Sequence, residues 1–345
     1  MKILVLSYPF YEYGEIIAKA FHNIGCDTNY ISYGYPNEGI KNIIKYSIPR
    51  RIGFDVERRL RSNFSIRVSK NIKLFKPDFI LLIRGDFLSD NLINAIKLAT
   101  PSPKIIVWTM DGIDKLDRLM IYRKEICHWF VFEPTDVCRL KHFYNISAEF
   151  LPLAFDPDYY HPNSKGSSAN LTDLSFIGSI KDKNRLTELD KLSKWSLDKK
   201  LDFKIISGNY RPRNFYIIYP YRYLWKCLYK RHMRHSEVNA LYNNCMININ
   251  IHKNQSIEGM NMRFFEIMGS GGLQIVEEKK SQKIIGFEPG KDFLTYSSHE
   301  DMLKKIKYVL DNPEKGREIA RNGFNKSTKH TFECRARTIL AHLLK

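Results

Sequence analysis

The sequence lacks any long hydrophobic run. No stretch approaches the roughly 18 consecutive apolar residues of a membrane-spanning helix. The N-terminal "MKILVLSYPF" contains only four consecutive aliphatic residues, fewer than the apolar core of a signal peptide. Low-complexity tracts and internal repeats are also missing. We therefore expect a folded, cytoplasmic protein that does not cross a membrane.

Cysteine motifs are equally scarce. The six cysteines are scattered, with no C-x-x-C pair and no histidines at a matching spacing. This pattern argues against both a zinc site and a disulfide framework, and it fits a reducing compartment. The sequence predicts no bound metal and no cofactor.

Acidic residues are few relative to basic ones: 37 Asp and Glu face 55 Lys and Arg, a formal net charge of +18. Such an excess attracts partners that carry phosphate. Nucleic acid, anionic lipid and a nucleotide-linked substrate all meet that description, and charge alone does not choose among them.

The 345 residues favour two domains, because a single core rarely grows so large. Short β-rich runs such as "KILVLS" and "DFILLI" alternate with amphipathic helical patterns, which predicts parallel sheets covered by helices on both faces. The expected class is α/β, with two doubly wound Rossmann-like domains facing a cleft. The predicted parts are an acceptor domain over residues 1–155, a donor domain over 156–329, and a helix over 330–345 that could return to the first domain. Ligands of such sheets bind beyond the carboxyl ends of the strands.

The stretch "SIEGMNMRFFEIMGSGGLQIVEE" concentrates opposite charges beside a glycine cluster. The preceding "CMININI" predicts a buried strand, so Glu258 falls in or just after the loop that follows it, and a helix begins near Asn261 and Met262. Free N–H groups at that helix start, with Arg263 in its first turn, suit a diphosphate. Glu266 shares the Arg263 face, and both glutamates suit the hydroxyls of a sugar and a ribose. The alternative is a surface glutamate and an ordinary helical salt bridge.

Three motifs within residues 171–330 resemble the second domain of the CgeB-like glycosyltransferases, relatives of glycosyltransferase family 4 with the two-Rossmann GT-B fold. They are "DLSFIGSIKDKNR", "MININIHKNQSIEGMNMRFFEIMGSGG" and "FEPGKDFLTYSSHEDMLKKIKYVLDNPEKGREIARNG". A weaker similarity reaches the first domain through "WTMDG" and "LPLAFDP". The resemblance places Glu258 near the donor sugar and Glu266 near its ribose, although CgeB-like members do not all keep the first glutamate.

The resemblance also implies that Lys183 and Arg185 contact the donor phosphates. They follow Gly178 and Ser179, and a glycine at a strand end lets backbone approach a ligand closely. The other interpretation of "KDKNR" is a solvated, charged helix start. Gly208 in "IISGN" ends another predicted strand and would lie beside the nucleotide, or would form an ordinary turn.

In the first domain, "WTMDG" ends a predicted strand at Asp111. An acidic residue there could deprotonate an acceptor hydroxyl, as inverting transferases require, or could hold it. Asp111 could equally be the N-cap of the following segment. The acceptor side is expected to include Tyr8, Tyr11, Gly14, Arg84 and Asp86.

Residues 203–236 hold eight Lys or Arg, nine aromatic residues and no acidic residue. Interleaved aromatics and cations favour a bilayer interface, and also single-stranded nucleic acid. Residues 41–76 add eleven basic residues against two acidic ones. No nucleic-acid motif accompanies the charge, so an anionic membrane is the favoured partner. The bland alternative is a solvated basic face.

Together these features predict a metal-independent glycosyltransferase, cytoplasmic or peripheral on the inner membrane face. It would move a sugar from a nucleoside diphosphate-sugar to a glycan or lipid-linked acceptor, with Asp111 and Glu258 as catalytic residues. No Asp-x-Asp pair stands in the cleft motifs, and basic groups can neutralise the leaving diphosphate. A nucleotide-sugar epimerase of the same fold and a non-catalytic binding or surface-assembly protein are the alternatives.

Overall fold

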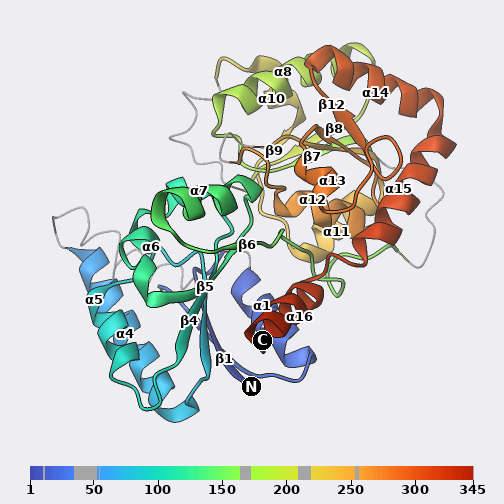
Figure 1. The fold of residues 1–345 in the computed structure, drawn as a ribbon. Coiled ribbons are helices and arrows are strands. Elements are labelled where there is room, and N and C mark those ends of the chain that lie inside the picture. Colours follow the sequence, from blue (N-terminus) through green and yellow to red (C-terminus); the bar gives the residue numbers. More distant parts are fainter. Residues whose placement is uncertain are drawn as a thin grey trace. The chain divides into compact units, whose positions relative to one another are not determined.

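The computed structural model describes residues 1–10, 12–34, 53, 55–163, 172–208, 219–252 and 256–344 (Figure 1). The contacts divide the chain into two units. Unit 1 consists of Met1–Pro152 and Phe332–Lys345, and unit 2 of Leu153–Thr331. The last helix, although it follows unit 2 in sequence, therefore belongs to unit 1.

Unit 1 is built around a parallel sheet of six strands in the order β2-β1-β3-β4-β5-β6. Its strands are β1 (Lys2–Ser7), β2 (Asp27–Ser32), β3 (Phe79–Ile83), β4 (Lys104–Trp108), β5 (Ile126–Val131) and β6 (Glu149–Phe150). Its helices are α1 (Tyr13–Asn23), α4 (Val56–Phe75), α5 (Asp90–Lys97), α6 (Asp117–Ile121), α7 (Pro134–Tyr144) and α16 (Phe332–Leu343). One helix was predicted near 112–125. The structure has the short α6 there, between 3₁₀ turns at Ile113–Lys115 and Arg123–Glu125.

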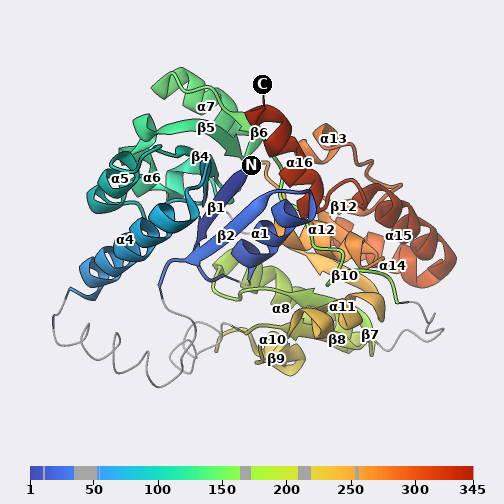
Figure 2. The ribbon, with the colours of Figure 1, turned by 90° about the horizontal axis from the view of Figure 1, so that it is seen from below.

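Helices cover both faces of the unit 1 sheet. The helices α4 and α5 pack together on one side, and α1 packs against α16 on the other (Figure 1; Figure 2). Strand β3, "FILLI", is buried along its whole length, as a strand covered on both faces must be. The side chains of Asp55 and Ser89 cap α4 and α5, which fixes where these helices begin.

Unit 2 repeats the plan, with a parallel sheet in the order β12-β11-β10-β7-β8-β9. Its strands are β7 (Thr172–Ile177), β8 (Phe203–Ile206), β9 (Leu228–Tyr229), β10 (Cys245–Asn250), β11 (Gln274–Glu277) and β12 (Leu294–Tyr296). Its helices are α8 (Lys183–Asp198), α10 (Arg222–Cys227), α11 (His235–Asn243), α12 (Met262–Gly269), α13 (Ser281–Ile284), α14 (His299–Asp311) and α15 (Pro313–Ser327). These two parallel sheets confirm the predicted α/β class.

Each sheet reverses its strand order once. In unit 1 the chain leaves β1 first to β2 and then to β3 on the other side, and in unit 2 it leaves β7 first to β8 and then to β10. The carboxyl ends of the strands flanking such a switch form a crevice in which α/β proteins bind ligands. The switch points therefore lie between β1 and β3 and between β7 and β10.

Candidate functional site

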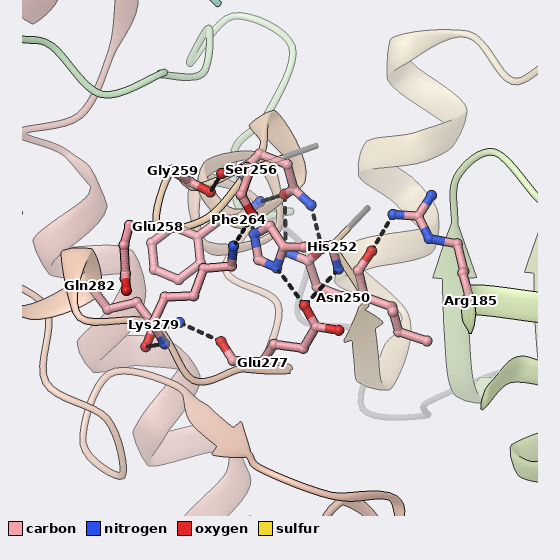
Figure 3. A network of polar contacts seen from close by, with 12 residues as sticks. Arg185, Asn250, His252, Ser256, Glu258, Gly259, Phe264, Glu277, Lys279 and Gln282 are labelled. Atoms are coloured by element: carbon pink, nitrogen blue, oxygen red, sulfur yellow. Dashed lines mark hydrogen bonds and ion pairs between the residues drawn. The ribbon is translucent and has the colours of Figure 1, made fainter. Parts of the chain in front are cut away.

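Arg185 lies at the switch point of unit 2. Its guanidinium donates to the carbonyl of Ser179, just after β7, at 2.9 Å, and to the carbonyl of Ile251, just after β10 (Figure 3). It also stacks over Phe176, 5.4 Å from the ring centroid. Burial lowers the pKa of Arg185 to about 10, so the group is still charged at neutral pH. Arg185, which the sequence predicted to contact the donor phosphates, therefore also links the ends of β7 and β10.

Gly178 and Lys183 both precede Arg185 in the sequence. A Cβ at Gly178 would lie 2.8 Å from the Phe176 ring, so any larger residue there would have to displace that ring. Lys183 is the first residue of α8 and is exposed, and the Asp182 side chain caps the helix by accepting from the Arg185 N–H at 3.0 Å. Lys183 is thus the more accessible of the two predicted cations.

Gly208 follows β8 and packs closely on His232. A Cβ there would lie 3.2 Å from the His232 Cα and 3.1 Å from its ring. A backbone this close to its neighbour leaves little room for a side chain, which accounts for the glycine. Residues 209–218, which belong to the predicted basic surface over 203–236, lie outside the described part of the chain.

The N-terminus of α12 is fixed by amide side chains. Asn261 caps the helix by accepting from the Phe264 N–H at 3.0 Å. Its own amide donates to Asn250 at 2.8 Å, and Asn250 in turn contacts Gln274 of β11. The predicted helix start at Asn261 and Met262 is therefore confirmed, and it is tied to two neighbouring strands.

Arg263 and Glu266 form an ion pair on α12, as their spacing predicted. The Glu266 side chain is only 1% exposed and that of Arg263 is 22% exposed. Tyr242 of α11 is buried beside this pair. The pair has the geometry of the salt bridge that the sequence offered as one of two interpretations.

Glu258 lies in the loop before α12 and contacts the segment after β11. Its carboxylate accepts from the N–H of Lys280 at 2.7 Å and from that of Ser281 at 3.4 Å. The Ser281 hydroxyl donates to the Glu258 carbonyl. Lys279 holds the same loop, since its Nζ donates to the carbonyls of Ser256 and Ile257 at 2.8 and 2.9 Å (Figure 3).

Sequence reasoning missed three residues at this edge: His252, Glu277 and Lys279. Glu277 is the last residue of β11, and His252 comes two residues after β10. The Glu277 carboxylate accepts from the His252 N–H at 3.2 Å (Figure 3). The signal was available, because polar residues directly after a buried strand, as in "NINIH" and "QIVEE", mark the carboxyl edge of a sheet.

In unit 1 the structure brings four predicted residues together at the switch point. Arg84 follows β3 and pairs with Asp86 at 3.3 Å and with Asp111, beyond β4, at 2.8 Å. Tyr8 follows β1, and its ring centroid lies 5.9 Å from the Arg84 guanidinium. Phe10 stacks on Tyr8 with ring centroids 5.5 Å apart. These side chains form one cluster of charges and aromatic rings.

Arg84 adopts a backbone conformation that few non-glycine residues adopt, with φ at 72°. Such strain persists only where the surroundings hold it, and it concentrates at functional sites. The pKa of Tyr8 is raised, first by burial and then by the negative charge of Asp86, so its hydroxyl stays protonated. Gly14 has a packing role, because a Cβ there would lie 2.1 Å from the Ser7 hydroxyl. Tyr11 lies outside the described residues.

Residues 188–341 match the model of a family described as glycosyl transferase-like. No curated protein sequence matches the chain. Among solved structures, the sucrose-phosphate synthase of Thermosynechococcus elongatus is similar over 100% of this chain and 99% of its own, with 12% identity and a TM-score of 0.71. Anabaena HepE in complex with UDP and glucose is similar over 99% of both chains, with 10% identity and a TM-score of 0.68. The lipopolysaccharide outer core galactosyltransferase WaaB covers 100% of this chain and 99% of its own, with 13% identity and a TM-score of 0.60.

The fold is GT-B. At these identities the solved structures establish the architecture, and the family match extends over most of unit 2 from α8 onward. Together they confirm the predicted enzyme class, a glycosyltransferase. Across the described ranges of this GT-B chain, no helix is long and apolar enough to span a membrane. Within those same ranges, no group of three or more His, Cys, Asp or Glu side chains could hold a metal ion.

Proposed function

We propose that the chain transfers a sugar from a nucleoside diphosphate-sugar to a glycan or glycolipid, as a relative of the CgeB-like glycosyltransferases. One observation carries the proposal. The glycosyl transferase-like match, over residues 188–341, includes the part of unit 2 in which a capped helix N-terminus and Arg263 follow the buried strand β10. Backbone N–H groups and an arginine at such a position suit a diphosphate.

The donor would bind to unit 2, with Arg263 and Lys183 at its diphosphate. These cations and the N-terminus of α12 would stabilise the negative charge of the leaving group, so that transfer would proceed without a metal ion. The similarity to a structure in complex with UDP and glucose supports a nucleoside diphosphate donor. Glu258 would act near the donor sugar and Glu266 near the ribose.

The acceptor would bind to unit 1. Asp111 would receive the proton of the attacking hydroxyl, and Arg84, paired with Asp111 at 2.8 Å, would orient the carboxylate. Asp86 and Tyr8 would hold further hydroxyls of the acceptor. Either a soluble glycan or a lipid-linked one fits these groups.

A lipid-linked acceptor would be met at the inner face of a membrane, with the enzyme cytoplasmic and peripheral. The basic segment 203–236 supports this part of the proposal, and Lys230 lies 3.8 Å from the ring centroid of Trp225 in its described part. A cation beside a large aromatic ring is common in proteins at bilayer interfaces.

The proposal is tested by a panel of nucleoside diphosphates and nucleotide-sugars, read by thermal unfolding. A ligand at 100 times its dissociation constant stabilises the fold by about 2.7 kcal/mol, which gives a clear shift. Turnover with the best donor is then followed with candidate acceptors, with and without EDTA. Failure of every nucleoside diphosphate to bind would contradict the donor assignment, and loss of turnover in EDTA would contradict metal independence.

A further inference from the structure

Glu277 is a partly exposed carboxylate at the carboxyl edge of the unit 2 sheet. It ends β11, next to β10, and its side chain is 35% exposed, whereas that of His252 is only 3% exposed. One of its oxygens, Oε2, accepts from the His252 backbone N–H at 3.2 Å and lies 3.5 Å from the His252 Nδ1 (Figure 3). The carboxylate is therefore held at one oxygen while part of the side chain reaches solvent.

His252 fixes the orientation of this carboxylate. Its Nε2 accepts from the backbone N–H of Asn261, the N-cap of α12, at 3.4 Å. The proton of the neutral ring must then be on Nδ1, which faces Glu277. The imidazole thus links Glu277 to the start of α12, where the diphosphate is proposed to bind.

Glu277 is ionised at neutral pH. Burial, the largest effect, raises its pKa, but the hydrogen bonds from His252 and the positive charge of Lys279 outweigh burial and lower the pKa below its usual range. An ionised carboxylate only accepts hydrogen bonds, which suits a pair of hydroxyl donors. Tyr296, at the end of the adjacent β12, is buried beside it, and the Glu277 charge adds to burial in raising the Tyr296 pKa.

The other two candidate carboxylates already have strong partners. Glu266 is 1% exposed and ion-paired with Arg263. Glu258 accepts from the N–H groups of Lys280 and Ser281. A ligand would have to break the ion pair to reach Glu266. Glu258 and Glu277 are both partly exposed and each uses one carboxylate oxygen for backbone N–H groups, but only Glu277 is also faced by a buried imidazole, that of His252.

We propose that Glu277, positioned by His252, accepts the hydrogen bonds of a vicinal diol of the nucleotide-sugar. This inference rests on the proposed function, because it needs the diphosphate to bind at α12. The diol is either that of the ribose or one on the transferred sugar. The two sources share the same chemistry, and the experiment separates them.

The experiment measures dissociation constants by calorimetry for wild type, Glu277→Gln and the control Glu278→Gln. Glu278 is the next residue along the chain and is exposed. The probes are UDP, ADP, GDP and CDP, then the 2′,3′-dideoxy form of whichever binds best, and finally the corresponding nucleotide-glucose. Glutamine keeps the shape of Glu277, and its amide oxygen still accepts from His252, so thermal unfolding should report an intact fold.

If the ribose diol is bound, Glu277→Gln weakens the ribonucleoside diphosphate about tenfold or more and leaves the dideoxy form unchanged. If the sugar diol is bound, only the nucleotide-glucose weakens. Glu278→Gln changes none of the three. If the ribose diol is bound, His252→Ala should reduce the preference of the protein for the ribonucleoside diphosphate over its dideoxy form. If His252 had only a structural role, its loss would weaken the binding of both forms equally.

The inference would be overturned if Glu277→Gln bound the ribonucleoside diphosphate, its dideoxy form and the nucleotide-glucose as tightly as wild type does. The inference would also be overturned if Glu266→Gln no longer distinguished the ribonucleoside diphosphate from its dideoxy form while Glu277→Gln still did. If wild type binds none of the nucleotides, the donor assignment itself fails and the inference falls with it, a result distinct from selective loss in the variants.

Discussion

Arg263 has one observed contact, with Glu266, and one proposed role, at the donor diphosphate. It neutralises the buried carboxylate of Glu266, and it stands in the first turn of α12, where an incoming diphosphate would compete for the same guanidinium. A buried carboxylate without a partner is costly, so a bound phosphate has to share Arg263 with Glu266 rather than replace it. An arginine suits this because its five N–H donors can serve two acceptors.

The first prediction concerns Arg263. In Arg263→Ala, affinity for the nucleoside diphosphate should fall by about 1.5–3 kcal/mol, the range for hydrogen bonds to charged groups. Calorimetry at a temperature where the variant is folded gives the value. Arg321, exposed on α15, supplies the control Arg321→Ala. An unchanged affinity in folded Arg263→Ala would remove Arg263 from the donor site.

The second prediction concerns Asp111. If it is the base of an inverting transfer, Asp111→Asn should lower kcat by about 10² to 10⁴ fold while donor affinity stays constant. Asp117 is exposed nearby in sequence, so Asp117→Asn serves as the control. A product with retained anomeric configuration would rule out this base role and leave Asp111 as an acceptor-binding group.

The third prediction concerns the pH dependence set by His252. Burial lowers its pKa in the folded state below the ordinary value of about 6.5. Between those two values the unfolded chain binds more protons, so this residue makes the free energy of unfolding decrease as pH falls below about 6.5. Denaturant unfolding at about pH 7.5 and 5.5 should show a smaller decrease for His252→Gln than for wild type. Equal decreases would contradict the assignment; the exposed His22, as His22→Gln, is the control.

At the scale of elements, the basic segment around α10 and β9 contains cations that pair with other residues but stay largely exposed. Arg231 and Arg234 both pair with Glu237 of α11, at 3.2 and 3.7 Å. These pairs are largely exposed and contribute little to stability, so the cations can still attract an anionic surface. Leu224 and Cys227 of the same segment are buried, which anchors it to unit 2.

The fourth prediction is that this segment binds anionic vesicles. Co-sedimentation should decrease as salt rises, because the Debye length falls from about 10 Å at 0.1 M to about 3 Å at 1 M. Glutamine at five cations should abolish it and leave transfer to a soluble acceptor unchanged; the five are Arg222, Lys226, Lys230, Arg231 and Arg234. Glutamine at the exposed Lys304 and Lys307 of α14 is the control. If wild type ignores such vesicles at low salt, a soluble acceptor is favoured.

At the scale of the whole chain, the last helix belongs to the first unit. Phe332 is buried in α16, with its ring 6.2 Å from those of both Trp108 and Tyr13. Arg335 donates to the carbonyl of Pro152 at 2.8 Å, and Asn23 of α1 donates to Glu333 at 2.6 Å. The stability of unit 1 therefore depends on residues at the far end of the sequence.

The fifth prediction follows from this arrangement. Phe332→Ala should destabilise unit 1 by about 3–5 kcal/mol, the usual range for removing a buried phenylalanine. Hydrogen exchange should then show faster exchange in β1 and α1, with β10 and β11 unchanged. Equal acceleration in both units would mean that they unfold together. Phe143→Ala, at an exposed position of α7, is the matched control.

The sequence by itself determined the features that depend on local spacing. Alternating β-rich and amphipathic runs define the two α/β units, since burial on both faces of a parallel sheet requires that pattern. The contact of Arg263 with Glu266 follows from a three-residue interval on a helix. The convergence of Tyr8, Arg84 and Asp111 follows from parallel strands, whose carboxyl ends share one edge.

Only the tertiary structure decided which groups these residues contact across the sheet. Arg185 reaches the carbonyl of Ile251 because β7 and β10 are neighbours at a switch point. His252 meets Glu277 because the register of β10 on β11 brings their ends level. These partners lie 66 and 25 positions apart. No local periodicity relates residues so far apart, because their contact depends on strand order and register, which packing of the whole unit selects.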